Sequence, residues 1–341
     1  MTNMTNLIRW FRANYPELVQ EMKNSEHGYN NEDSNPYHVE GDVWTHTMMV
    51  CKAAENLPIE NKITALLHDI GKPASRKIIE EQRKVRFQNH EGISTFMAIT
   101  ILDKMIEENI INEKQKIEIL TLISWHGESW KVSSQQLMSY FNVNEYELMI
   151  KLLNQIKADE EGRFVDSDAH SLDEELFNYE NFMDNAKKEI CYDTKAPTIT
   201  LLIGLPGCGK STTSSLLNGT IISRDKFIEE YNTEKTYNEN WKSLSDEQHK
   251  EIDQLVQIEF NRAIKNKENI IIDMTNMSRK SRRKWLIPAQ QKGYFSTGIV
   301  FLVPKEVCAS RRYENSGKYI SDVVYKMMMG NFMMPGYDEF D

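Results

Sequence analysis

Side chains that commonly bind metal ions recur through the first half of the chain. The set comprises His46, His68, Asp69, His90, His126 and Asp159. Imidazole and carboxylate groups are suitable ligands for Mn²⁺, Fe²⁺, Co²⁺, Ni²⁺ and Zn²⁺. His68 and Asp69 are adjacent at the end of an apolar segment, where two polar side chains are costly to bury unless something ligates them. The pattern therefore predicts a metal site formed by these six residues.

A phosphate ester is the substrate that such a site would suit. The Asp69 carboxylate has two oxygens and is a candidate to bridge two metal ions, which together generate a hydroxide and clamp a phosphate. Lys72 follows in the segment His-Asp-Ile-Gly-Lys, and its ammonium group is placed to bind a phosphate oxygen. The grouping predicts phosphate-ester hydrolysis, with Asp69 and Lys72 as catalytic residues.

The sequence does not decide two features of this predicted metal site. His90 and His126 belong to the site only if it binds two metal ions rather than one. Asp159 competes for the last ligand position with Glu160, Asp166 and Asp168. His38 is a candidate for a position just outside the ligands. Three other histidines are interpreted as surface or capping residues: His27, His170 and His249.

A glycine-rich segment in the second half matches the phosphate-binding pattern GxxxxGKS. Residues 204–212 read GLPGCGKST, between an apolar run and a helix-like run. Glycines allow backbone N–H groups to converge on phosphate oxygens. Lys210 would place its charge against the β and γ phosphates of a nucleoside triphosphate, and the Ser211 hydroxyl would bind Mg²⁺. The candidate nucleotide-binding residues here are Gly204, Pro206, Gly207, Cys208, Gly209, Lys210, Ser211 and Thr212. The alternative is a glycine-rich turn.

Two aspartates follow apolar runs of the same half, where parallel strands would end and ligand sites form. Asp225 is a candidate general base that accepts a proton from an attacking hydroxyl. The alternative is that it caps the helix that follows. Asp273 is a candidate to orient the metal or Lys210, and its alternative role is a turn at the strand end.

Two basic segments lie further along the chain. Residues 278–285 read SRKSRRKW and are interpreted either as a solvated helix face or as a contact for a phosphate backbone. Arg311 and Arg312 follow the last apolar run, with Lys318 nearby. They are candidates for a lid over the γ-phosphate, which adds Arg312 to the nucleotide-binding and catalytic residues.

The elements that would position these residues differ between the two halves. Up to about residue 185, apolar residues at three-and-four spacing predict helices, as in 43–57, 63–69, 92–108, 113–125 and 145–159. Later, short apolar runs at 198–203, 220–223, 269–273 and 297–303 alternate with helical stretches and predict a parallel sheet. We therefore predict an all-α domain over residues 1–190 and an α/β domain over residues 191–341.

Bulk composition narrows the classes of function. The net charge of −10 opposes binding along extended nucleic acid, but it permits an enzyme that grips only a strand end. The sequence shows neither an apolar stretch of about 18 residues that would span a membrane nor a signal peptide. The four cysteines are scattered, which argues against a thiolate zinc site and a disulfide framework and favours a reducing compartment.

The second half resembles the kinase domain of bacteriophage and bacterial 5′-OH polynucleotide kinases. The motifs that carry the resemblance are GLPGCGKS, SRD, DMTN, RR and the tail PGYDEFD, over about residues 197–341. The resemblance implies that Lys210 and Ser211 hold ATP or another NTP with Mg²⁺. It also implies that Asp225 activates the 5′-OH, Asp273 supports the phosphate loop and Arg312 sits in a lid.

Two positions depart from this family. Ile228 stands where the family often has an arginine that holds the substrate phosphate. The second lid arginine falls near residues 315–316, so that Lys318 would substitute for it. Both departures concern how the acceptor is recognised, not the kinase class.

The first half resembles the HD phosphohydrolase superfamily over about residues 36–170. The motifs are WTHT, LLHDIGKP, FQNHEG, SWHG and KADEEGRF, which are especially similar to the HD domains attached to transfer-RNA nucleotidyltransferases. The resemblance implies that His46, His68, Asp69 and Asp159 hold one metal ion. It implies that Asp69, His90 and His126 hold a second.

The order of the halves resembles bacterial and phage fusions of an HD domain with a polynucleotide kinase, which heal broken RNA or DNA ends. The implied activities are hydrolysis of a 2′,3′-cyclic, 2′- or 3′-phosphate and phosphorylation of a 5′-OH, followed by sealing by a separate ligase. The expected location is the cytoplasm of a bacterium or of a phage-infected host, without membrane partners. RNA is the favoured target because 2′,3′-cyclic ends arise only from RNA.

Two alternatives remain from the sequence. An HD phosphohydrolase that acts on nucleotides, fused to a kinase for a nucleoside or small metabolite, would suit the acidic charge. A non-enzymatic RNA-binding or toxin-control module would use the metal only structurally. The sequence leaves the oligomeric state open.

Overall fold

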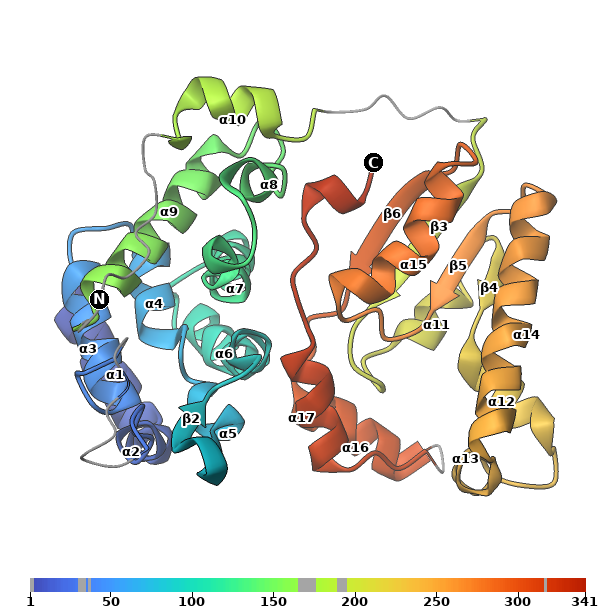
Figure 1. The fold of residues 1–341 in the computed structure, drawn as a ribbon, viewed down its shortest axis with the longest axis horizontal. Coiled ribbons are helices and arrows are strands. Elements are labelled where there is room, and N and C mark those ends of the chain that lie inside the picture. The colour runs from blue at the N-terminus through green and yellow to red at the C-terminus, as the bar shows by residue number, and fades with distance from the viewer. Residues whose placement is uncertain (1–2, 30–34, 36–37, 165–175, 189–194, 316–317) are drawn as a thin grey trace. The chain divides into compact units, whose positions relative to one another are not determined.

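The computed structural model describes residues 3–29, 35, 38–164, 176–188, 195–315 and 318–341. The chain forms two compact units (Figure 1). One contains Met1–Lys188 and Met329–Met334, and the other contains Glu189–Met328 and Pro335–Asp341. The predicted fold class is confirmed, with a helical region followed by a domain with a parallel four-stranded sheet.

The first unit is built almost entirely from helices. They are α1 (Met4–Asn14), α2 (Pro16–Lys23), α3 (Val43–Ala53), α4 (Ile59–Leu67), α5 (Lys72–Ser75), α6 (His90–Glu107), α7 (Glu113–Trp125), α8 (Ser134–Met138), α9 (Tyr146–Glu161) and α10 (Tyr179–Asn185), with the 3-10 turns η1 (Glu80–Gln82) and η2 (Glu128–Trp130). The exception to the predicted all-α domain is a small antiparallel pair, β1 (Lys77–Ile79) and β2 (Lys84–Arg86).

Helices α3, α4, α6, α7 and α9 pack around the core of this unit. In α4, the apolar side chains of Ile63, Leu66 and Leu67 are fully buried, as the three-and-four spacing predicts. The start of α7 agrees with the sequence because Asn112 and Gln115 form a capping box there. The five packed helices carry the candidate metal ligands within them or at their ends.

The second unit is an α/β layer structure. Its strands are β3 (Thr198–Ile203), β4 (Thr220–Ile222), β5 (Ile270–Asp273) and β6 (Phe295–Val300). Its helices are α11 (Lys210–Ser214), α12 (Arg224–Tyr231), α13 (Tyr237–Ser243), α14 (Asp246–Lys265), α15 (Arg279–Gln290), α16 (Lys305–Asn315) and α17 (Asp322–Gly330), with the 3-10 turn η4 (Tyr337–Glu339). The last two residues of α17 belong to the first unit. The sheet order is β4-β5-β3-β6 and all pairs are parallel.

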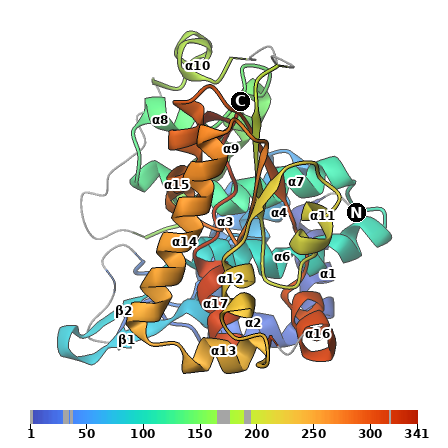
Figure 2. The same cartoon turned by 90° about the vertical axis from the view of Figure 1, so that its right-hand side faces the viewer.

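Helices cover both faces of this sheet. Helices α14 and α15 lie on one face and α11 lies on the other (Figure 2). The strand predicted at 297–303 starts two residues earlier and ends three residues earlier, because all six residues of β6 pair with the six residues of β3. Parallel order brings the carboxyl ends of β3, β4 and β5 to one edge, where the phosphate loop and both candidate aspartates follow.

Two further expectations concern membranes and cysteines. Within the part of the chain that the structure describes, no helix combines the length and apolar character needed to span a bilayer. Cys51, Cys208 and Cys308 are buried and not disulfide-bonded, and Cys191 lies outside the described residues.

Candidate metal centre and phosphate loop

The histidines of the first unit converge on two buried carboxylates. His46 lies on α3, His68 follows α4, His90 begins α6 and His126 follows α7. The Nε2 atom of His46 lies 2.9 Å from an Asp159 oxygen, and that of His68 lies 3.2 Å from Asp69 Oδ2. The structure thus brings the six predicted ligands together although they span 114 positions of the chain, from 46 to 159.

Hydrogen bonds to backbone carbonyls orient all four rings. Nδ1 of His46 lies 3.1 Å from Gly162 O, and Nδ1 of His68 lies 3.0 Å from Ala65 O. The corresponding distances are 2.8 Å from His90 to Phe87 O and 2.7 Å from His126 to Ile123 O. A carbonyl only accepts, so each Nδ1 carries a proton. With the proton on Nδ1, Nε2 is the nitrogen that would give its lone pair to a metal ion, because a metal-bound imidazole is neutral.

Asp69 stands between two ligand groups. His46, His68 and Asp159 form one, and Asp69, His90 and His126 form the other, with the ligand atoms of each within 4.8 Å of one another. Asp69 Oδ2 faces His68, while Oδ1 lies 3.1 Å from Nε2 of His90. One carboxylate therefore contacts both groups, as a bridging ligand would.

The residues present fit divalent metal ions. The Nε2 atom of His68 and both Asp69 oxygens are buried and form no hydrogen bond of normal geometry, although charged neighbours lie within ion-pair distance of them. Buried polar atoms are nearly always paired, so such orphans mark a place for a ligand. The donor set of imidazoles and carboxylates suits Mn²⁺, Fe²⁺, Co²⁺, Ni²⁺ or Zn²⁺ and does not select among them.

In the second unit, the glycine-rich segment forms a loop between β3 and α11. Gly207 and Gly209 have φ values of +88° and +109°, which other residues rarely adopt. A Cβ atom on Gly207 would lie 2.4 Å from Cys308 O, so space also requires glycine. Lys210 begins α11 and donates to the carbonyls of Gly204 and Leu205 at 2.9 and 2.8 Å, which folds its ammonium group back across the loop.

Asp225 lies in the first turn of α12, just beyond β4. Its carboxylate accepts from the Tyr237 hydroxyl at 3.0 Å and from the Lys318 ammonium at 3.2 Å. The alternative role as helix cap is wrong, because Ser223 occupies the N-cap position. Lys318, the predicted substitute for a lid arginine, thus lies against the candidate base.

Asp273 ends β5 and accepts a hydrogen bond from Ser214 of α11 at 3.3 Å. On the other side of the loop, Nη1 of Arg311 donates to Gly207 O at 3.3 Å. The Cγ atom of Arg312 lies 3.2 Å from the position that a Cβ on Gly207 would take. The structure therefore brings the candidate lid arginines to the phosphate loop.

Both halves match known domain families. Residues 43–161 match the model of the HD domain, and residues 199–329 match the model of the AAA domain. The chain joins an HD phosphohydrolase domain to a P-loop kinase-type domain. A search of curated proteins found no match to the chain.

Electrostatics keep the carboxylates of the HD domain ionised. Burial alone would raise the pKa of Asp69, but the charges of His68 and Lys72 hold it well below its usual range. Burial opposes ionisation of Asp159 too, but Arg163 together with the hydrogen bonds from His46 and His68 outweighs it, so the pKa of Asp159 is also well below its usual range. Both side chains are therefore anionic at neutral pH, as metal ligands would need to be.

Lys72 lies beside the candidate metal centre of the HD domain. Its ammonium nitrogen is 2.7 Å from Asp69 Oδ2, and its side chain is buried. Among the acids that compete for the last ligand position, Asp159 is the one grouped with His46 and His68. Asp166 and Asp168 lie outside the described residues, as does His170.

Sequence reasoning misplaced His27 and missed two charged neighbours. His27 is 1% exposed and contacts Lys72, so its interpretation as a surface or capping residue is wrong. Glu40 accepts from His46, and no local pattern indicated it. Arg163 pairs with Asp159 four residues earlier, a helical spacing that could have revealed it. His249 is half-buried, and its ring lies against that of Trp241.

Proposed function

We propose that the chain heals broken nucleic-acid ends at two separate sites. The HD domain hydrolyses a 2′,3′-cyclic, 2′- or 3′-phosphate, and the P-loop domain transfers the γ-phosphate of ATP or another NTP to a 5′-OH. The observation that carries the proposal is that each domain holds a buried lysine at its candidate site: Lys72 beside Asp69, and Lys210 folded across the glycine-rich loop. RNA is the favoured substrate, and the products suit a separate ligase in the cytoplasm.

In the HD domain, bound metal ions would supply a hydroxide nucleophile and a positive clamp for the phosphate. His46, His68 and Asp159 would hold one ion, and His90 and His126 the other, with Asp69 shared. Lys72 binds a non-bridging phosphate oxygen and stabilises the charge that accumulates there. Its burial excludes water and so strengthens this attraction.

In the P-loop domain, Lys210 binds the β and γ phosphates and Ser211 binds Mg²⁺. Asp273 holds Ser214 of the loop helix in place. Asp225 takes the proton from the acceptor hydroxyl as its oxygen bonds the γ-phosphorus and the bond from that phosphorus to the β–γ bridging oxygen breaks, which releases the nucleoside diphosphate. Arg312 neutralises charge on the transferred phosphoryl group.

Aromatic side chains beside Asp225 support a nucleotide-bearing acceptor. Tyr237 donates to Asp225, and its ring stacks near that of Trp241 at 6.1 Å between centroids. Trp241 is 45% exposed although Arg224 lies over its ring. Exposed aromatic rings with neighbouring cations are a common platform for bases of single strands. A short aromatic platform near Asp225, rather than a long basic face, also agrees with the net charge of −10.

The proposal is tested with an RNA that carries a 5′-OH and a 2′,3′-cyclic phosphate. We expect label transfer from γ-labelled ATP with Mg²⁺, and phosphate-end hydrolysis with Mn²⁺ or Ni²⁺. Lys210→Ala should abolish only the first activity, and Asp69→Ala only the second. Phosphorylation of a mononucleoside but of no oligonucleotide would support the nucleotide-level alternative instead, and absence of both activities in folded protein would refute end healing.

A further inference from the structure

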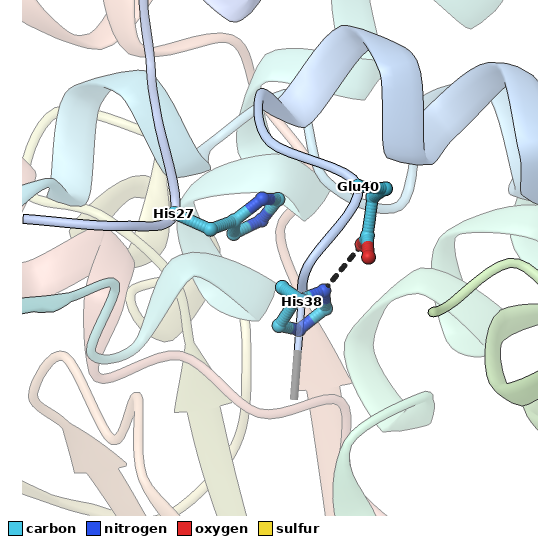
Figure 3. A group of neighbouring side chains, drawn as sticks. All are labelled: His27, His38 and Glu40. Atoms are coloured by element: carbon cyan, nitrogen blue, oxygen red, sulfur yellow. Dashed lines mark hydrogen bonds and ion pairs between the residues drawn. The ribbon is translucent and has the colours of Figure 1, made fainter. Parts of the chain in front are cut away.

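Three side chains next to the metal centre precede the residues that match the HD domain. His27, His38 and Glu40 lie before residue 43, where the match begins. Figure 3 shows the two imidazole rings face to face, with Glu40 beside His38. Each residue offers an atom that could ligate a metal, and these atoms lie within 4.8 Å of one another. The group therefore has the composition of a third metal site.

The geometry of the rings argues against a third metal ion. The rings of His27 and His38 are stacked, with centroids 4.2 Å apart and planes 10° from parallel. The lone pair of an imidazole nitrogen lies in the ring plane, and nearly parallel planes do not direct two lone pairs to one point. Nδ1 of His27 also donates to Gly41 O at 2.9 Å, and Nε2 lies 3.2 Å from the Lys72 ammonium.

These contacts instead hold Lys72. Because Nδ1 of His27 donates to a carbonyl, Nε2 is an acceptor, and the Lys72 ammonium donates to it. Lys72 also lies 2.7 Å from Asp69 Oδ2, and its ammonium group is 5.6 Å from the centroid of the Phe87 ring. Metal ions on Asp69 would take up its oxygens and repel the ammonium group. His27 then remains as the partner that keeps Lys72 at the site.

Glu40 holds a metal-ligand histidine in the same way. Its Oε1 atom lies 3.0 Å from Nδ1 of His46, whose proton it shares with Gly162 O, and 2.7 Å from Nδ1 of His38. The Glu40 side chain is fully buried, so this carboxylate interacts in a dry environment. A carboxylate that accepts from the outer nitrogen of a ligating histidine orients the ring and strengthens it as a ligand. His38 links this contact to the stacked ring of His27.

We propose that His27, His38 and Glu40 form a positioning layer, in which Glu40 sets the metal ligand His46 and His27 sets the phosphate-binding Lys72. The layer binds no metal itself. The proposal rests on the hydrolase function proposed above, because Lys72 must be positioned to bind phosphate only if the site acts on phosphate esters.

The first test is binding of inorganic phosphate to metal-loaded full-length protein, measured by calorimetry. His27→Phe removes the acceptor for Lys72, and we expect phosphate affinity to fall about tenfold or more, as for loss of a hydrogen bond to a charged group. His27→Gln should largely restore binding, because its amide can donate to Gly41 O and accept from Lys72. The metal content of both variants should equal that of the unaltered protein.

The second test is metal affinity, measured by competition with a chelator. Glu40→Gln should weaken affinity by about 10–100-fold, whereas Glu26→Gln, an exposed carboxylate of the neighbouring segment, should leave it unchanged. Loss of one metal equivalent at saturation in Glu40→Gln or His27→Phe would show that the layer itself binds an ion. Unchanged affinities for metal and phosphate would show that it only supports the fold. If unaltered protein binds metal but no phosphate, the proposed hydrolase function fails instead.

Discussion

Three of the four candidate metal-site histidines are oriented by hydrogen bonds to carbonyls close in the chain, whereas His46 bonds the distant Gly162 O. Nδ1 of His68, His90 and His126 each bonds the carbonyl three residues earlier in the chain. His68 and His126 follow directly after helices, where carbonyls are left without helical partners. A histidine at a helix end thus acquires its tautomer locally, and only the direction of the helix decides where Nε2 points.

Asp69 is the residue on which both ligand groups depend. Asp69→Asn keeps the size of the side chain but removes the charge that two metal ions would share. We expect loss of hydrolysis and loss of at least one metal equivalent on dialysis, with label transfer to the 5′-OH unchanged. Full metal content in the variant would contradict a bridging role, and metal analysis of the purified protein decides the matter.

Asp225 is expected to act in the chemical step and not in nucleotide binding. Asp225→Asn keeps the size of the side chain and one acceptor oxygen, for Tyr237 or Lys318, but its amide is a far weaker base. We expect kcat for 5′-OH phosphorylation to fall about 10²–10⁴-fold, the usual contribution of general base catalysis, with ATP affinity little changed. Near-normal kcat in Asp225→Asn would show that another residue acts as the general base.

Trp241 tests recognition of the acceptor. Trp241→Ala removes an exposed ring near Asp225, the candidate general base. Stacking of a nucleobase on such a ring contributes about 1–3 kcal/mol to binding. The KM for an oligonucleotide should therefore rise about fivefold or more, while the KM for ATP stays constant. Equal KM values for the variant and the unaltered protein would place the terminal base away from this ring.

At the scale of elements, the sequence predicted the bounds of the helices and strands that are determined by residues close in the chain. Strand β3 has the predicted bounds because an apolar run meets a glycine turn, and α7 because a capping box starts it. The basic run 278–285 could not be interpreted in this way. Arg282 is fully buried and forms two hydrogen bonds with Glu339, 57 residues away, and a partner at that distance leaves no pattern in the sequence.

The ion pair between α15 and η4 should matter for stability. Glu339→Gln leaves the buried guanidinium of Arg282 with a neutral partner, and breaking buried pairs costs about 3–5 kcal/mol. We expect earlier unfolding of the second unit in urea. Glu268→Gln, which alters an exposed pair with Arg262, is the matched control and should change little. Equal midpoints for the two variants would show that the buried pair is not needed.

At the scale of the molecule, the first compact unit is not continuous in sequence. Residues 329–334 belong to it, although they follow the P-loop domain. Met334 N donates to Ser124 at 2.8 Å, and Nε1 of Trp125 donates to Met334 O at 2.9 Å. The ring of Phe332 lies 5.0 Å from that of Phe96. The predicted division at residue 190 did not anticipate this segment, because a short run of Met and Phe has no periodicity.

Phe332 therefore should stabilise the unit that contains the candidate metal site. Phe332 and Phe96 are both buried, and Phe96 lies on α6, the helix that begins with His90. Phe332→Ala would leave a cavity against α6, a loss of about 3–5 kcal/mol for a buried phenylalanine. In the full chain, phosphate-end hydrolysis should be lost at a lower temperature than in the unaltered protein, with 5′-OH phosphorylation less affected.

Val323→Ala, at a side chain that is 76% exposed, is the control and should leave the inactivation temperatures of both activities unchanged. Equal loss of the two activities in Phe332→Ala would contradict an effect confined to the first unit.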